Sequence, residues 1–498
     1  MFQILGGRGS ALNLNSVPYV LFLAAAAGVY RLLKPGWRNG FLLAVSWLFY
    51  LICTPRFLPL LLATTLWTYG LGLAMERRPN RKKALLVLGL CINFGILFLL
   101  KYLGFFAELV NGVLARLGIG PVVLPSLLLP AGISFYTFAV CGYLMDVYRG
   151  RQPAERSVWD FALFAAFFPA VLSGPIERAA HLLPQLRANR LPGSGASGAD
   201  VKFGVTRFLV GLAKKMILAD QLAILVNTAY GAPENFRGVQ LLAAAVAYSL
   251  QIYCDFSAYS DMAVGSARLF GIRLLENFDA PYCSRSVKEF WRRWHISLSG
   301  WFRDYLYFPL GGSRRGGFRT GLNVLIVFAV SGLWHGAAMT FVVWGLLNGA
   351  YQVVGGWLQP ARRRLRAGLR IPENAKPVKA VQVAVTFLLL TITWIFFRAD
   401  SIPQAMLILR RIAAMAGGIF PLGLTALGLS RARLLAVALG TLVLLVLDAA
   451  GGRKGLTERL CGTVWLRYAV WVGLILAVAV FGAYGSGYNA QEFLYFQF

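Results

Sequence analysis

The chain has 498 residues, of which 58% are hydrophobic and 14% charged. This excludes an ordinary soluble domain and indicates a membrane protein, because a soluble protein of this size needs a largely polar surface. In a soluble chain, the formal net charge of +29 would suggest nucleic acid binding. Here the basic residues gather in short segments between apolar runs, at 77–83, 314–319 and 362–366, which the positive-inside rule places in the cytoplasm. We therefore expect membrane lipids, and no nucleic acid, as partners.

Apolar runs follow one another along the whole chain. The candidate spans are residues 17–30, 41–53, 57–74, 84–100, 122–143, 159–172, 203–219, 239–253, 322–347, 381–397, 412–429, 434–447 and 465–481. Several are shorter than the roughly 20 residues of a complete span, which predicts re-entrant segments. The sequence thus predicts an all-α polytopic membrane protein with about 11 to 13 transmembrane or re-entrant helices.

We expect a single integral membrane domain over residues 1–498, with three regions of different character. Residues 1–150 read as plain N-terminal helices, and plain C-terminal helices resume over 375–498. The middle region, 240–350, concentrates Asp, Tyr, Trp and Arg with two of the three histidines. Polar groups inside a membrane must be satisfied internally or line water, so this region is the predicted catalytic core.

Two carboxylates, Asp255 and Asp261, follow the predicted span 239–253. An embedded carboxylate is costly without a partner. We favour structural ion pairs with Arg268, Arg292 or Arg293 over direct catalysis, because ion-pair networks also occupy such positions. Both residues are therefore assigned to a structural polar core, and direct catalysis is kept as the alternative.

The segment 284–312 predicts one amphipathic helix that lies at the membrane interface instead of spanning it. Ser286 and Glu289 have the spacing of a capping box, so the helix should begin near Val287. At 100° per residue its apolar face holds Trp291, Trp294, Leu298, Trp301, Phe302 and Tyr305. His295 should lie at the seam between this face and the polar one, as part of a site or as an incidental histidine of an interfacial helix.

His335 is the only ionisable side chain, tyrosines aside, between Arg319 and Arg362. It sits in the run 322–347, which is long enough to cross the bilayer as one helix. An ionisable group in hydrocarbon usually faces a cavity and has a function, and imidazole changes protonation near neutral pH. The interpretation is a catalytic base inside the membrane, and the alternative is a buried histidine bonded to a neighbouring helix.

Small residues surround His335 and would let helices or a substrate approach the backbone closely. Ser331 lies one turn earlier and is placed to orient the imidazole ring. The six cysteines show no CxxC or zinc-site spacing, and no metal site is expected.

Four blocks of sequence carry a family resemblance. They are 167–178 (FFPAVLSGPIER), 253–262 (YCDFSAYSDM), 289–312 (EFWRRWHISLSGWFRDYLYFPLGG) and 330–337 (VSGLWHGA). These blocks closely resemble the membrane-bound O-acyltransferase (MBOAT) family, in its bacterial alginate O-acetyltransferase-like branch. The resemblance implies a multi-helix funnel with a narrow central passage, in which the family's catalytic histidine matches His335 and its second histidine matches His295.

The resemblance also implies a reaction. In such proteins an activated acyl group arrives on the cytoplasmic side and is passed to a hydroxyl at or across the membrane. Bacterial relatives modify exported polysaccharides, commonly with a periplasmic SGNH-type partner, and one related branch D-alanylates teichoic acids. We therefore expect acetyl-CoA or another acyl thioester as donor substrate, no tightly bound cofactor, and a multi-pass protein of the bacterial inner membrane. The shared motifs do not identify the acceptor.

For acyl transfer from a thioester, His335 is expected to act as general base, and His295 to stabilise the oxyanion or orient the donor. The residues expected to bind the substrate or donor are Lys288, Arg292, Arg293, Arg303, Trp334 and Ser331. The four basic ones among them suit an anionic donor, and equally a helix held against anionic lipid. Two competing functions stay open: a transporter that uses the histidines without chemistry, and a scaffold that recruits a separate acetyltransferase.

Overall fold

A computed structural model describes residues 12–450, 462–483 and 493, apart from 126, 371, 373, 374, 416, 419 and 421. Over these residues the chain is helical, and the extended pairing in them is one isolated bridge between Phe278 and Trp294. The chain divides into two compact units, one of Met1–Phe208 with Tyr259–Leu275, the other of Leu209–Ala258 with Glu276–Phe498. The predicted all-α polytopic class is confirmed, whereas the single-domain description stays a prediction.

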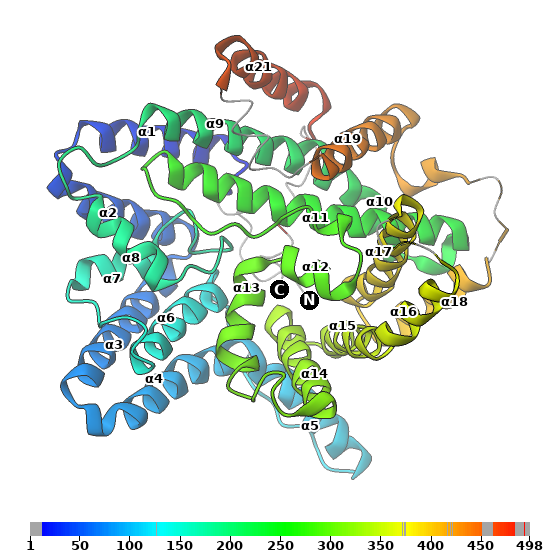
Figure 1. The fold of residues 1–498 in the computed structure, drawn as a ribbon, viewed down its shortest axis with the longest axis horizontal. Coiled ribbons are helices and arrows are strands. Elements are labelled where there is room, and N and C mark those ends of the chain that lie inside the picture. Colours follow the sequence, from blue (N-terminus) through cyan, green and yellow to red (C-terminus); the bar gives the residue numbers. More distant parts are fainter. Residues whose placement is uncertain are drawn as a thin grey trace. The chain divides into compact units, whose positions relative to one another are not determined.

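The first unit is built from the N-terminal helices (Figure 1). They are α1 (Val17–Leu32), α2 (Pro35–Cys53), η1 (Pro55–Phe57), α3 (Leu58–Arg77), η2 (Pro79–Arg81), α4 (Lys82–Leu97), η3 (Phe98–Tyr102), α5 (Leu103–Arg116), α6 (Ile133–Tyr148), α7 (Val158–Ala166), α8 (Ala179–Ala188), and parts of α9 (Gly198–Ala213) and α11 (Gly238–Arg268). Helices α2 and α3 both pack on α7, and α4 packs on α6. The aromatic rings of Tyr19 on α1, Phe49 on α2 and Phe168 after α7 pack against one another.

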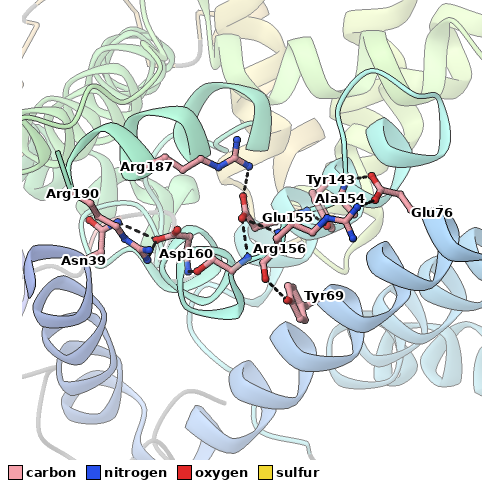
Figure 2. A network of polar contacts seen from close by, with 11 residues as sticks. Asn39, Tyr69, Glu76, Tyr143, Ala154, Glu155, Arg156, Asp160, Arg187 and Arg190 are labelled. Carbon is pink, nitrogen blue, oxygen red and sulfur yellow. Dashed lines mark hydrogen bonds and ion pairs between the residues drawn. The ribbon is translucent and has the colours of Figure 1, made fainter. Parts of the chain in front are cut away.

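Polar contacts fix the segment that links α6 to α7 in this unit (Figure 2). The Glu76 carboxylate of α3 accepts the Ala154 N–H and pairs with Arg156, both at 2.5 Å. The Glu155 N–H donates to the Tyr143 hydroxyl of α6 at 3.0 Å. The two backbone N–H groups thus have acceptors in a buried or part-buried segment, where an unpaired donor would be costly.

The second unit contains the remaining helices. They are η4 (Lys214–Ala219), α10 (Asp220–Gly231), η5 (Pro233–Asn235), η6 (Pro281–Cys283), α12 (Val287–Arg293), α13 (Ile296–Phe302), η7 (Arg303–Tyr307), α14 (Gly316–His335), α15 (Met339–Trp357), α16 (Gln359–Gly368), α17 (Lys376–Arg398), α18 (Ile402–Ala413), η8 (Leu424–Leu427), α19 (Arg431–Ala449) and α21 (Val464–Phe481). The first part of α11 also belongs here, so this long helix contributes to both units.

Seven helical stretches among the described residues are long and apolar enough to cross a membrane. They are Pro55–Arg77, Pro79–Arg116, Gly238–Arg268, Gly316–His335, Lys376–Arg398, Arg431–Ala449 and Val464–Phe481. Two shorter apolar helices, α1 and α6, accompany them. The chain is therefore a multi-pass membrane protein, and the central funnel stays a prediction.

The predicted single span over 322–347 is wrong. Helix α14 ends at His335, the backbone is extended at Gly336 and again at Ala338, and α15 then begins at Met339. The two helices form a hairpin, adjacent in Figure 1, because glycines let their backbones meet. A Cβ at Gly332 would lie 2.2 Å from the Phe341 carbonyl oxygen. His335 thus sits at the turn of a hairpin and not inside a continuous helix.

Candidate functional site

Helix α12 begins where the sequence predicts. The Ser286 hydroxyl accepts the Glu289 N–H at 3.1 Å, and the Glu289 carboxylate accepts the Arg285 N–H at 2.9 Å. The prediction of one long amphipathic helix is nevertheless wrong. The helix ends at Arg293, Trp294 is extended, and His295 adopts a left-handed conformation (φ 43°, ψ 55°) before α13 begins.

The loop that precedes α12 forms backbone hydrogen bonds with the residues on both sides of His295 and so stabilises the interruption between α12 and α13. Phe278 forms its β-bridge with Trp294, and the Asp279 N–H donates to the Arg293 carbonyl at 3.0 Å. On the other side of His295, Asn277 accepts three hydrogen bonds. Its carbonyl accepts the Ile296 N–H at 3.0 Å, and its side-chain oxygen accepts the Ser297 hydroxyl at 2.6 Å and the Ser297 N–H at 3.3 Å. A left-handed non-glycine residue costs about 1–3 kcal/mol and persists where its surroundings enforce it. The loop enforces it here.

His295 is fully buried (0% exposed), so its predicted place at a half-wet helix seam is wrong. The ring of Phe256 from α11 meets it edge to face, with centroids 4.7 Å apart, and the Trp334 ring lies at 5.8 Å. Burial lowers the pKa of His295 to about 3. The imidazole is therefore neutral at physiological pH, with one nitrogen able to donate and the other able to accept.

His335 is the last residue of α14 and is 3% exposed. Its ring lies 4.9 Å from Trp334, 5.1 Å from Trp344 of α15 and 5.4 Å from Phe397 of α17. The His295 and His335 rings are themselves 6.4 Å apart, centroid to centroid. Two imidazoles from distant motifs thus share one aromatic enclosure, where little solvent screens their interactions.

The structure places the other predicted binding residues at different distances from the solvent. Trp334 lies against both imidazoles, and Ser331 is buried one turn before His335. Lys288, Arg292 and Arg303 are exposed. Arg293 is half-buried and pairs with Glu289 at 2.9 Å. The basic residues therefore present charge at the surface, while the histidines lie in the interior.

Asp255 and Asp261 are both buried and both paired with cations, as a structural polar core requires. The cations found beside them differ from those that the sequence suggested. Asp255 pairs with Lys215 at 2.7 Å, and Asp261 pairs with Arg207 at 2.8 Å. Arg268 pairs with another carboxylate, Asp200, at 2.9 Å.

Several residues of this region were not predicted from the sequence as part of the site. Phe256, Trp344 and Phe397 read there as ordinary apolar positions, because helical periodicity does not tell which ring meets an imidazole. Lys214 and Lys215 did carry a signal, since two adjacent lysines inside the apolar run 203–219 are costly unless they are paired.

The fold and the site together define a class: a multi-pass helical membrane protein with a buried pair of histidines between a broken helix and a helical hairpin. Residues 155–397, which contain both histidines, match the model of MBOAT, the membrane-bound O-acyltransferase family. The chain belongs to this family and is an O-acyltransferase. The resemblance deduced from the four sequence blocks is thereby confirmed.

Three relatives show the range of similarity. A probable alginate O-acetylase of Pseudomonas putida is 39% identical over 444 residues, which cover 88% of this chain and 86% of the relative. A peptidoglycan O-acetyltransferase of Helicobacter pylori is 31% identical over 410 residues, or 77% of this chain and 75% of the relative. A teichoic acid D-alanyltransferase of Streptococcus thermophilus is 30% identical over 289 residues, or 55% and 69%.

Proposed function

We propose that this O-acyltransferase moves an acetyl group from acetyl-CoA, or another acyl thioester, on the cytoplasmic side of a bacterial inner membrane. The acceptor is a hydroxyl of an exported polysaccharide, or of a periplasmic relay protein of the SGNH type. The observation that carries the proposal is the burial of His295 and His335 side by side in one aromatic enclosure. Acyl transfer needs a base and a polar donor in a site that excludes water, and this pair supplies both.

His335 is the general base in this proposal. Its neutral ring nitrogen takes the proton of the acceptor hydroxyl while the oxygen attacks the thioester carbonyl carbon. The carbon–sulfur bond then breaks, and the imidazolium returns the proton to the departing thiolate. Base catalysis of this kind is worth about 10²–10⁴-fold in rate. The enclosure by Trp334, Trp344 and Phe397 limits hydrolysis of the thioester by water.

His295 is the polar donor in this proposal. Because burial keeps it neutral, it carries one N–H, which in this proposal donates to the developing oxyanion or to the donor carbonyl. One such donor is worth about 3 kcal/mol of transition-state stabilisation. Its left-handed backbone, fixed by Asn277 and Phe278, presets the ring before the substrate arrives.

The exposed Lys288, Arg292 and Arg303 are proposed to attract the anionic donor to this site. Arg303 also pairs with its neighbour Asp304 at 3.0 Å, and its side chain is 62% exposed. The competing explanation is that the same residues bind anionic lipid. Only donor attraction predicts a changed KM for the donor when these basic side chains are neutralised.

An acetyl group and a uronic-acid polysaccharide such as alginate are the favoured donor and acceptor. The support is the extent of similarity: relatives named alginate O-acetylases match at 38–39% identity over 86% or more of this chain, while the D-alanyltransferases match at 28–30% over 44–55%. The test must distinguish acetylation of such a polysaccharide from four alternatives: D-alanyl transfer to teichoic acid, peptidoglycan acetylation, transport and scaffolding.

The test uses the purified protein in lipid nanodiscs with radiolabelled acetyl-CoA. Oligomannuronate, peptidoglycan fragments and an SGNH-type protein are offered separately, and label on any of them is measured. The proposal expects a labelled acceptor, and no label with a folded His335→Ala variant. If no acceptor leads to consumption of the thioester, the transporter or the scaffold is favoured. A parallel reaction with a D-alanyl thioester tests the other acyl group, and transfer of D-alanine but not of acetyl would replace acetyl in the proposal.

A further inference from the structure

Two consecutive lysines, Lys214 and Lys215, bind side chains on one turn of α11. They open the π-helix η4, and both are buried, with Lys215 only 1% exposed. The Lys215 ammonium lies 2.7 Å from a carboxylate oxygen of Asp255 and 2.9 Å from one of Asp220. The Lys214 ammonium donates to the Ser257 hydroxyl at 3.1 Å. The two contacted residues of α11 therefore flank Phe256 in the sequence.

Stability alone does not explain why two charged lysines are buried here. Removing two charges from water costs several kcal/mol per ion, and well-packed apolar residues often replace such pairs without loss. Ionisable residues inside membrane proteins usually serve a function, and π-helical turns such as η4 occur often at functional sites. What the lysines hold in place is the turn that carries Phe256.

Phe256 connects this turn to the histidine site. Its ring meets the His295 imidazole edge to face, 4.7 Å from centroid to centroid at 78°. It also packs against Phe278 at 5.0 Å, and Phe278 in turn packs against Trp294 at 5.1 Å. A shift of the 255–257 turn would thus move both the ring that faces His295 and the residue that pairs with Trp294.

We propose that Lys214 and Lys215 are positioning residues, which set the orientation of the His295 ring by fixing Asp255 and Ser257 on either side of Phe256. The role of the His295 ring in acyl transfer rests on the proposed function above, whereas its orientation by the two lysines does not. Neither lysine is required to touch the substrate.

The chain contains a matched control for the cost of losing a buried ion pair. Arg207 of α9 and Asp261, on the part of α11 that belongs to the first unit, form a second pair. Their side chains are 2.8 Å apart and at most 3% exposed. Breaking this pair should destabilise the protein to a similar degree, because the charge left behind is equally buried. It removes no contact of Asp255 or Ser257.

The first experiment observes the histidine directly. The chain has three histidines, so a protein labelled only in its histidine rings gives three imidazole signals by NMR in nanodiscs. His295→Gln and His335→Gln assign them. We expect Lys214→Met and Lys215→Met each to move or broaden the His295 signal while the His181 signal stays, and Arg207→Met to leave the His295 signal in place. Because two methionine variants are used, the positioning role can still be tested if one of them does not fold.

The second experiment measures transfer with the same variants. Since a misplacement of about 1 Å can cost about 100-fold, kcat should fall roughly 10- to 100-fold in the lysine variants with KM for the donor nearly unchanged. An unmoved His295 signal in both lysine variants overturns the positioning role even if the wild type transfers acetyl groups. A moved signal in a protein without transfer activity contradicts the proposed function and leaves the positioning role standing. If Arg207→Met lowers kcat as much as the lysine variants do, the lysines act only by stabilising the fold and the positioning role is contradicted.

Discussion

The imidazole rings of His295 and His335 lie 6.4 Å apart, centroid to centroid, although one follows a broken helix and the other ends a helix at a hairpin turn. Trp334 contacts both rings, at 5.8 Å and 4.9 Å. His295 lies between two helices and His335 is the last residue of α14, so tertiary contacts hold each ring in place. The two rings are therefore held by different elements of the fold.

The first prediction concerns His335 as a base. His335→Gln keeps the size and polarity of the side chain but removes a group that can accept the hydroxyl proton. We expect kcat to fall by about 10²–10⁴-fold, with little change in donor affinity. Single-turnover measurements with labelled donor give the rate, and donor binding is measured separately by calorimetry. A variant that retains more than a tenth of wild-type kcat would contradict the role of base.

The second prediction concerns acid stability. The pKa of His295 is about 3 in the folded protein, against 6.5 in an exposed histidine. Below pH 6.5 the unfolded chain therefore binds the proton and the folded protein does not, so stability is lost as the pH falls toward 3. Between pH 7 and pH 5 this amounts to about 2 kcal/mol.

Thermal unfolding in detergent at pH 7 and pH 5 measures this difference. The melting temperature of wild type should drop more between the two pH values than that of His295→Gln, whatever their absolute values. Parallel drops in the two proteins would show that His295 already binds the proton in the folded state.

Local signals in the sequence predicted local structure well. The start of α12 at Val287 follows from Ser286 and Glu289, whose bonds to nearby backbone groups need no distant partner. The break at His295 could not be predicted in this way, because it depends on pairing with Asn277 and Phe278, which come before the helix. His335 stands out in the sequence as the one ionisable side chain of its apolar run besides tyrosines, and His295 through its place in the amphipathic segment; the family resemblance then gives both a role. No periodicity indicates that the two rings meet.

Hydropathy failed at the hairpin for a physical reason. The turn after His335 is as apolar as the helices beside it, since Gly336 and Ala338 carry no polar signal. Charge composition likewise indicated that Asp255 needs a cation but not which one. Lys215 lies far away along the chain, and only the packing of η4 against α11 brings the two together.

The third prediction concerns the hairpin. In Gly332→Ala the new methyl group would lie 2.2 Å from the Phe341 carbonyl oxygen, a backbone atom that cannot turn aside. We expect a loss of at least about 1–3 kcal/mol, the usual cost of overpacking, together with reduced transfer because His335 is three residues away. Gly355→Ala in α15 is the control, since nothing lies within 4 Å of its new methyl group. Equal melting temperatures for the two variants would show that α14 and α15 do not pack this closely.

The last prediction concerns the polar network of the first unit (Figure 2). Arg190 pairs with Asp160 at 2.5 Å, and Asp160 is buried with one further bond from Asn39. Arg156 pairs with Glu76 at the same distance, but its own side chain is 68% exposed. Breaking a buried pair costs roughly 3–5 kcal/mol and breaking an exposed one less than about 1 kcal/mol. Since Arg190 is itself 37% exposed, we expect Arg190→Gln to cost about 2 kcal/mol and Arg156→Gln to cost little.

Thermal unfolding of the two glutamine variants checks this ranking. The double variant Arg190→Gln with Asp160→Asn should recover part of the loss, because it also removes the carboxylate that Arg190→Gln leaves buried without its cation. A double variant less stable than Arg190→Gln alone would mean that Asp160 stabilises the unit mainly through its bond with Asn39. In that case the network would depend on its hydrogen bonds more than on its charges.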